Sequence, residues 1–409
     1  MNETTMEMLK LAAVFAILII AINRKCRLSL AVAIASAAGI VIFGLNASEA
    51  GSILVQTATS WETISMLLIF YLIIFLQRML EEKDQMCKAQ KNLDNLFHNR
   101  RINATVAPML IGLLPSPAAA SICGGIVEDA CGDSLDAEDK AFVTSYFRHI
   151  PESFLPTYAE IVMMSELSGV PLSSFTLGML IPVAVMYLIG YIGWIRKIPR
   201  RRSSDQKIEK VNFGRELVAL FYHLWTLFAI IICVLVFKLE VLPSIACVIV
   251  LDLFIDRFQL KQIPVLARKA LDPELLISTW FIFLFKNILV DAGVIAALPE
   301  FFSTLPIPTY LIFALIFFFG SLTAGSTAMV AMCTSVAFHA VSGPAMPLMV
   351  LLKTFAWAAS QMSPTHICLI IAADYFHISL GTLIRKTILP VVLLCAFTVM
   401  YYLALVVLA

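Results

Sequence analysis

The chain has 409 residues, of which 60% are hydrophobic and 14% are charged, and its formal net charge is +1 at pH 7. A mean hydropathy of +0.90 exceeds what a soluble core requires, so the composition excludes an ordinary soluble globular protein and indicates a multi-pass membrane protein. The net charge identifies no partner; we expect contact with membrane lipid and none with nucleic acid.

The first three apolar runs are predicted to cross the membrane as ordinary helices. They lie at about 8–22, 29–45 and 62–79. The residues before the first run are acidic and the basic residues follow it, which is unlike a cleaved signal peptide, so we expect this run to be retained. The polar segment 82–101 is predicted to be an interfacial helix.

The next region is predicted to be a re-entrant hairpin at about 102–131. Between Arg101 and Glu128 there are 26 uncharged residues with Pro115-Ser116-Pro117 at the middle. This stretch is too long for one arm and suits two arms of about a dozen residues each. We therefore expect its tip to lie near the middle of the membrane.

A broken helix at about 139–168 and a last span at 172–195 complete the first half. Pro151 and Pro156 interrupt the broken helix, because proline lacks the backbone N–H that a helix interior needs. The second half repeats this order, with spans at 214–237, 242–256 and 274–290, a hairpin at about 309–338, a broken helix at about 344–374 and a last span at 381–408.

The similar order reflects a predicted duplication with a constant offset. Shifting the sequence by 208 residues matches Gly112 with Gly320, Pro156-Thr157 with Pro364-Thr365, and Pro182-Val183 with Pro390-Val391. We predict a first repeat at 1–195, a basic cytoplasmic linker at 196–213 and a second repeat at 214–409.

The distribution of basic residues predicts the topology. Five crossings in each half force the second half to be inverted relative to the first. With both termini outside, 24 of the 29 Lys and Arg residues lie on the inner side, as the positive-inside rule requires. The predicted fold is an all-α polytopic membrane protein of about ten transmembrane helices in two inverted-topology repeats.

The hairpin tips and the helix breaks carry the prediction of a polar site. Unpaired peptide groups in hydrocarbon cost several kcal/mol each, so non-helical backbone at this depth must lie inside protein or beside a water-filled cavity. Ser116-Pro117 and Ser363-Pro364 each match a serine N-cap followed by proline, which suits the start of a half-helix. Such helix starts attract anions. The alternative is that these small and hydroxyl residues only allow close helix packing.

Intramembrane ionisable residues give the second line of evidence. Arg148 and Lys353 are predicted to hold an anionic substrate, with Glu152 as counter-ion or proton acceptor. The alternative is a buried ion pair between Glu152 and either cation. His366 would donate to the substrate or titrate, or else only pack between helices. The complete predicted substrate site is Ser116, Pro117, Ser121, Arg148, Glu152, Thr157, Gly325, Ser326, Thr327, Lys353, Ser360, Gln361, Ser363, Thr365 and His366.

Several of these segments resemble known families. The paired hairpins and broken spans resemble the ion transporter superfamily, which includes carriers of dicarboxylates, citrate, gluconate and arsenite and some sodium/proton antiporters. GLLPSPAAAS at 112–121, FRHIPESFLP at 147–156 and SPTHICLIIAADYF at 363–376 are most similar to a prokaryotic integral-membrane family, domain of unknown function 401. That similarity covers nearly the whole chain.

The resemblance implies a substrate site flanked by two sodium sites, and a homodimer. By position, the first sodium site would use Ser116, Ser121 and Thr157, and the second would use Thr323, Ser326, Thr327 and Thr365. The dicarboxylate carriers show a Ser-Asn-Thr triplet at each site, whereas this chain has Pro-Ser-Pro and Gly-Ser-Thr. Sodium dependence is therefore an open question, and proton coupling through Glu152 or His366 is the alternative.

The predicted function is secondary transport of a small organic anion across a prokaryotic inner membrane, driven by a sodium or proton gradient. A cation/proton antiporter without an organic substrate is the alternative. A membrane-embedded metal enzyme is a more distant alternative, because the proline in His149-Ile-Pro-Glu152 disrupts the helical spacing that a pair of metal ligands needs. The nine cysteines are expected to be small buried hydrophobes, and we expect no catalytic residue and no cofactor other than Na⁺.

Overall fold

The protein is all-α. The computed structural model describes residues 3–24, 26–96, 99–113, 118–199, 212–294, 298, 306–364 and 366–408, and within these ranges it contains α-helices and short 3₁₀ helices but no strand. Five of the described helices are long and apolar enough to cross a membrane, and five shorter apolar helices accompany them. The chain is therefore a multi-pass membrane protein.

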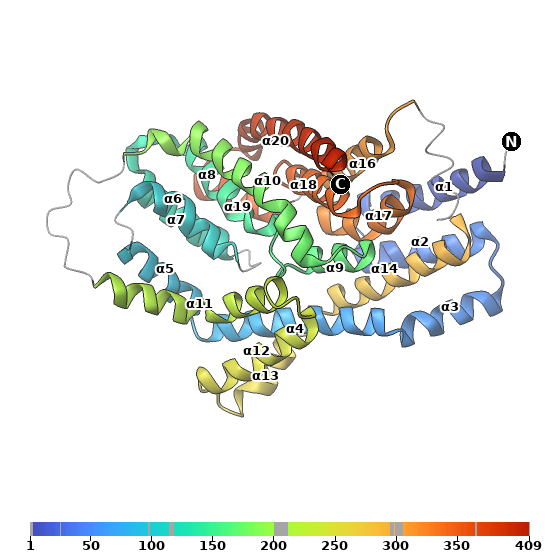
Figure 1. Cartoon of the computed structure of the whole chain (residues 1–409), viewed down its shortest axis with the longest axis horizontal. Helices are drawn as coiled ribbons and strands as arrows, with labels where there is room; N and C mark the ends of the chain where they lie inside the picture. Colours follow the sequence, from blue (N-terminus) through green and yellow to red (C-terminus); the bar gives the residue numbers. More distant parts are fainter. Residues whose placement is uncertain are drawn as a thin grey trace.

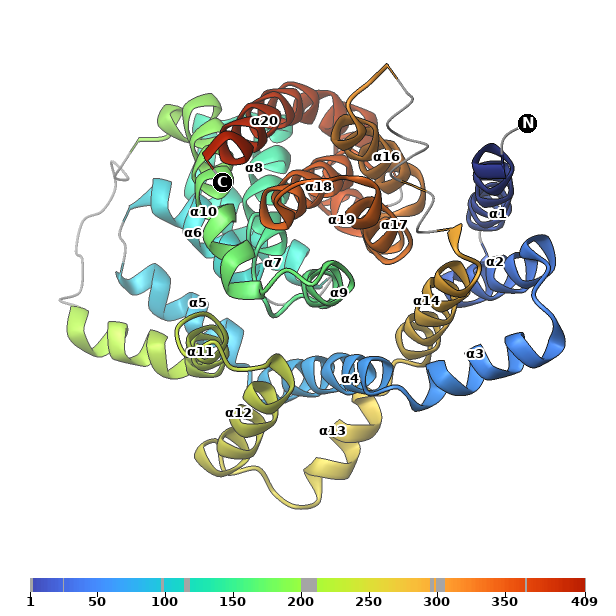
Figure 2. The same cartoon turned by 45° about the vertical axis from the view of Figure 1, so that its right-hand side comes forward.

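The helices form two groups, which we call the outer layer and the central bundle (Figures 1 and 2). The outer layer consists of α1 (Glu3–Asn23), α2 (Leu28–Phe43), α3 (Ala47–Thr59), α4 (Trp61–Glu82), α5 (Gln85–Leu96), α11 (Phe213–Leu235), α12 (Val241–Ile255), α13 (Gln262–Ala270) and α14 (Pro273–Asp291). In this group α14 packs on α2, α3 and α4, and α11 packs on α5 and α12.

The central bundle contains the later helices of both halves. Its members are α6 (Arg100–Ile111), α7 (Ala118–Cys131), α8 (Ala137–His149), α9 (Ala159–Ser168), α10 (Leu172–Gly193), α16 (Thr309–Ala324), α17 (Ser326–Ala340), α18 (Ala345–Ser360), α19 (Ile367–Tyr375) and α20 (Leu380–Leu408). Helices from the two halves interleave, since α8 packs on α19 and α20 while α9 packs on α17 and α18. The two groups meet at several places, where α5 contacts α6, α14 contacts α17, α11 contacts α10, α4 contacts α9 and α1 contacts α16.

The outer layer contains two described helices, α3 and α13, that the hydropathy pattern does not predict. The segment between the second and third apolar runs forms α3 rather than a polar connection. Asn46 caps this helix: its side chain accepts from the backbone N–H of Glu49, and Glu49 in turn accepts from the N–H of Asn46. This capping box starts a helix whose Ile53 packs on Ile288 of α14.

Helix starts in the central bundle recur at one spacing. Ala118 and Ser326 begin α7 and α17, Ala137 and Ala345 begin α8 and α18, Ala159 and Ile367 begin α9 and α19, and Leu172 and Leu380 begin α10 and α20. Each of these pairs is 208 residues apart. Helix boundaries in the bundle therefore follow the same offset as the Gly and Pro matches in the sequence.

Candidate functional site

Two helices of the central bundle are interrupted. After α8 ends at His149, a 3₁₀ turn (Pro151–Ser153) and a non-helical segment, 154–158, precede α9. After α18 ends at Ser360, a turn that contains Pro364 precedes α19. The prolines remove backbone donors at both places, so the helices end where the sequence predicts an interruption.

A third interruption separates α16 from α17, which pack against each other. Gly325 lies between them with φ of 89° and ψ of 150°, a combination that suits glycine and strains residues with a Cβ atom. The corresponding connection between α6 and α7 includes Ser116 and Pro117, which lie outside the described residues, as do Thr365 and the side chain of Ser121.

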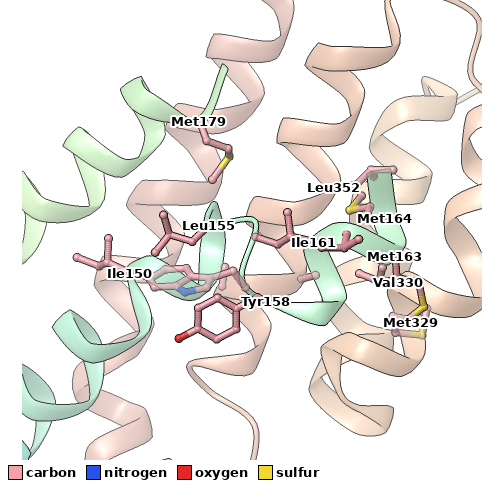
Figure 3. Close-up of a cluster of buried hydrophobic side chains, with 14 of the residues drawn as sticks. Ile150, Leu155, Tyr158, Ile161, Met163, Met164, Met179, Met329, Val330 and Leu352 are labelled. Atoms are coloured by element: carbon pink, nitrogen blue, oxygen red, sulfur yellow. The ribbon is translucent and has the colours of Figure 1, made fainter. Parts of the chain in front are cut away.

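Protein surrounds the interruption between α8 and α9. Ile150, Leu155 and Tyr158 are at most 7% exposed. They lie in one hydrophobic cluster with Ile161 of α9, Met329 and Val330 of α17, and Leu352 of α18 (Figure 3). The hydroxyl of Tyr158 donates to the carbonyl oxygen of Gly112, which ties this segment to the end of α6. The non-helical backbone is therefore enclosed, as its peptide groups require.

A buried ion pair joins the two halves. The Lys353 ammonium of α18 lies 2.5 Å from Glu160 Oε1 of α9, and the two side chains are 1% and 8% exposed. The Ser326 hydroxyl, at the start of α17, donates to Glu160 Oε2 at 2.9 Å. Lys353 is thus already neutralised by a carboxylate rather than open to an anion.

This pair corrects one alternative drawn from the sequence, in which Glu152 neutralises Lys353. The partner is Glu160, because α9 resumes after the interruption and packs on α18. Glu152 instead lies near His149, with 3.8 Å between Glu152 Oε2 and His149 Nε2, and its side chain is 27% exposed. Glu160 is absent from the predicted site, although an acidic residue within a predicted membrane segment is a signal of a functional position.

A second polar cluster lies between α8 and α19. Arg148 Nη1 is 3.2 Å from His149 Nε2 and 3.3 Å from Cys368 Sγ. The rings of His149 and His366 meet edge to face, with centroids 4.8 Å apart. The indole N–H of Trp357 on α18 donates to the carbonyl oxygen of His149 at 2.7 Å, which fixes α18 against the end of α8.

Two members of this cluster, His149 and Cys368, are absent from the substrate site that the sequence predicts. The sequence places His149 only in the metal-enzyme alternative, and it predicts Cys368, like the other cysteines, to be a small buried hydrophobe. Cys368 lies two residues after His366 in its own segment, but its other neighbours in the cluster, Arg148 and His149, come from α8 more than two hundred residues earlier. His366 and Arg148 are in the predicted site, and the structure brings them together.

The other predicted polar residues bind mainly to backbone or to one another. Ser360 and Ser363 donate to the carbonyl oxygens of Trp357 and Leu322, and Gln361 donates to the Ser360 hydroxyl. Thr323 is exposed and donates to the carbonyl oxygens of Phe319 and Gly320 in its own helix. Thr327, near the start of α17, is half-buried, and no described contact joins its side chain to the other predicted sodium ligands.

Thr157 differs from the other hydroxyl residues. It is 8% exposed, and its hydroxyl has no hydrogen-bond partner among the described residues. It lines a small apolar cavity together with Leu113, with Gln77 of α4 and with Leu227 of α11. Thr157 therefore lies where the interrupted helix of the bundle meets the outer layer.

One solved structure with a similar chain is the Alcanivorax borkumensis YdaH transporter, described as having an unusual topology; it is 10% identical over 88% of this chain and 89% of that chain, with a TM-score of 0.49. No curated protein matches. The family model described as "Protein of unknown function (DUF401)" matches residues 7–407. The chain therefore belongs to the DUF401 family, as its sequence motifs predict.

Proposed function

We propose that the protein is a secondary transporter that moves a small organic anion across the inner membrane, driven by a sodium or proton gradient. The observation that carries the proposal is the meeting of two interrupted helices, α8–α9 and α18–α19, around buried charged side chains. Interrupted helices with ionisable residues are costly in a membrane protein and are typical of substrate and ion pathways.

Arg148 is the proposed anion-binding group. Arg148 is 5% exposed at the end of α8, and its Nη1 contacts His149 Nε2 and Cys368 Sγ. A guanidinium presents a planar set of donors that suits a carboxylate or an oxyanion. Lys353 is not part of this proposal, because Glu160 already neutralises it.

The Lys353 ammonium has a different proposed role, as a fixed cation in place of the second sodium ion. It contacts the same carboxylate that accepts from Ser326, one of the residues predicted to bind that ion. A covalently attached cation satisfies Glu160 without leaving the protein. Cation coupling would then use the region of Thr157, whose hydroxyl has no described partner, or proton transfer at Glu152.

We propose that the central bundle moves against the outer layer during transport. The bundle holds both interrupted helices, and the outer layer meets it at several separate contacts, among them α5–α6, α14–α17 and α4–α9. The 208-residue spacing of helix starts supports two structural repeats, as this mechanism requires. In the proposed orientation both termini lie outside and the basic linker 196–213 lies in the cytoplasm.

Ligand screening of the purified protein tests the proposal. We expect one class of small carboxylates or oxyanions to raise the unfolding temperature, with a dependence on sodium or pH. Arg148→Gln should abolish that increase, and Arg78→Gln, a change in an i,i+3 pair at the surface of α4, should retain it. If every ligand acts equally on both variants, the anion site is wrong. A pH-dependent sodium flux that needs no anion would favour a cation/proton antiporter.

A further inference from the structure

Three possible metal ligands meet beside Arg148. The His149 and His366 rings and the Cys368 thiol each offer one ligand atom, and these atoms all lie within 4.8 Å of one another. They come from the end of α8 and from both sides of the start of α19. This is the one such His and Cys group that the structure shows in the described parts of the chain.

Both imidazoles are oriented as metal ligands usually are. His149 Nδ1 lies 2.6 Å from the carbonyl oxygen of Ser145, and His366 Nδ1 lies 3.0 Å from that of Ser360. A carbonyl oxygen can only accept, so each Nδ1 carries a proton, and the neutral ring then presents its lone pair on Nε2. A backbone acceptor that fixes the tautomer in this way accompanies most metal-binding histidines.

The ligand set favours a thiophilic ion. One thiolate and two imidazoles suit Zn²⁺ and Cu(I), whereas Na⁺, Mg²⁺ and Ca²⁺ prefer oxygen ligands. Zn²⁺ would need a fourth ligand, and Glu152 is positioned near the group, with its Oε2 3.8 Å from His149 Nε2. Cu(I) would need only the three.

Arg148 occupies part of the space that a metal ion would take. Its Nη1 contacts both His149 Nε2 and Cys368 Sγ, the same atoms that would bind the ion. Binding therefore requires the guanidinium to turn away and the Cys368 thiol to release its proton to solvent. The guanidinium and the thiol proton would then be replaced by one soft cation bound to the Cys368 thiolate.

We propose that His149, His366 and Cys368 form a binding site for a thiophilic d¹⁰ cation, Zn²⁺ or Cu(I). The inference rests on the ligand geometry and not on the proposed transport function, although Arg148 and Glu152 take part in both proposals. Occupancy would cross-link α8 to α19 and so hold the interrupted ends of the two helices together.

Metal titration of the reduced, full-length protein in detergent tests this site, with Zn²⁺ and Cu(I) added separately against competing chelators. We expect one ion per chain, and a loss of affinity of at least about tenfold in Cys368→Ser and in His366→Gln. Glu152→Gln should weaken Zn²⁺ but not Cu(I), which identifies the ion. Arg148→Met should strengthen binding, because it removes a competing donor and a positive charge.

The chain provides matched controls. His339 on α17 also places Nδ1 2.6 Å from a carbonyl oxygen four residues earlier, and Cys333 is also a free cysteine, although it is buried whereas Cys368 is half-buried. His339→Gln and Cys333→Ser should leave the affinity unchanged. Failure of the unmodified protein to bind either ion at one per chain would overturn the proposal, as would equal losses in the cluster variants and the controls. Either result would leave the anion-transport proposal to be judged by its own ligand screen.

Discussion

The Lys353 ammonium and the Glu160 carboxylate, 2.5 Å apart, join α18 of the second half to α9 of the first half inside the central bundle. Two charges out of water repay their desolvation only when each has a close partner and further hydrogen bonds. Glu160 gains such a bond from Ser326. The pair therefore connects three helices, two of which begin at an interruption.

Replacing one partner of this ion pair should lower the stability of the protein more than replacing both partners. Lys353→Met leaves the Glu160 carboxylate buried without its cation, and we expect a loss of about 3–5 kcal/mol in stability. Lys353→Met combined with Glu160→Gln should recover much of that loss. Thermal unfolding in detergent measures the differences.

The control for this double-mutant cycle is Lys286 with Glu62, which also pairs two helices but keeps 21% and 35% of its side chains exposed. Lys286→Met should cost less than about 1 kcal/mol, because solvent screens the charge that is left. If the Lys353 and Lys286 variants lose the same stability, the buried pair does not hold the bundle together.

Gly112 and Gly320 occupy matching positions but should respond unequally to alanine. A Cβ at Gly112 would overlap the backbone carbonyl oxygen of Arg148, which cannot move without shifting the end of α8. A Cβ at Gly320 would overlap only the flexible side chain of Met329.

We expect Gly112→Ala to lower stability by about 1–3 kcal/mol and Gly320→Ala to cost less than about 1 kcal/mol. Thermal unfolding compares the two, and ligand-induced stabilisation should also be lost in Gly112→Ala because Arg148 moves. Equal effects of both substitutions would mean that α6 does not fix the position of Arg148.

Gly325 should tolerate a side chain poorly even though space is available. Nothing lies within 4 Å of a Cβ placed there, so the cost of Gly325→Ala is that of its backbone conformation. We expect a loss of about 1–3 kcal/mol. Gly51, inside α3 and equally uncrowded, should instead gain about 0.5–1 kcal/mol on substitution by alanine. A stable Gly325→Ala variant would show that α16 and α17 can join without the interruption.

The proposed orientation predicts which exposed positions face the cytoplasm. Cys87 on α5 is exposed and follows the predicted inner end of α4, whereas Glu240 lies on the connection between α11 and α12, which we place outside. In chains with one cysteine, an impermeant maleimide should label Glu240→Cys on intact cells and label Cys87 only after permeabilisation. The opposite pattern would invert the proposed topology.

The sequence predicted helices and their interruptions better than it predicted contacts. Proline and glycine act on their own backbone, so Pro151, Pro364 and Gly325 mark interruptions that need no knowledge of the rest of the chain. The partners of Lys353 and Cys368 depend on how α9 and α8 pack on helices of the other half, and periodicity carries no such information. The helix α3 was missed because its capping box lies in a polar segment that hydropathy treats as a connection.

Transport by the reconstituted protein tests the central claim most directly. Proteoliposomes would be loaded with the anion class found by ligand screening, and exchange of labelled anion would be measured with sodium and pH gradients imposed separately. We expect saturable exchange that requires one of the two gradients or its ion, that Arg148→Gln abolishes and that Arg78→Gln retains. Exchange that is absent in the unmodified protein, or unchanged by Arg148→Gln, would contradict the claim that the interrupted helices form an anion pathway.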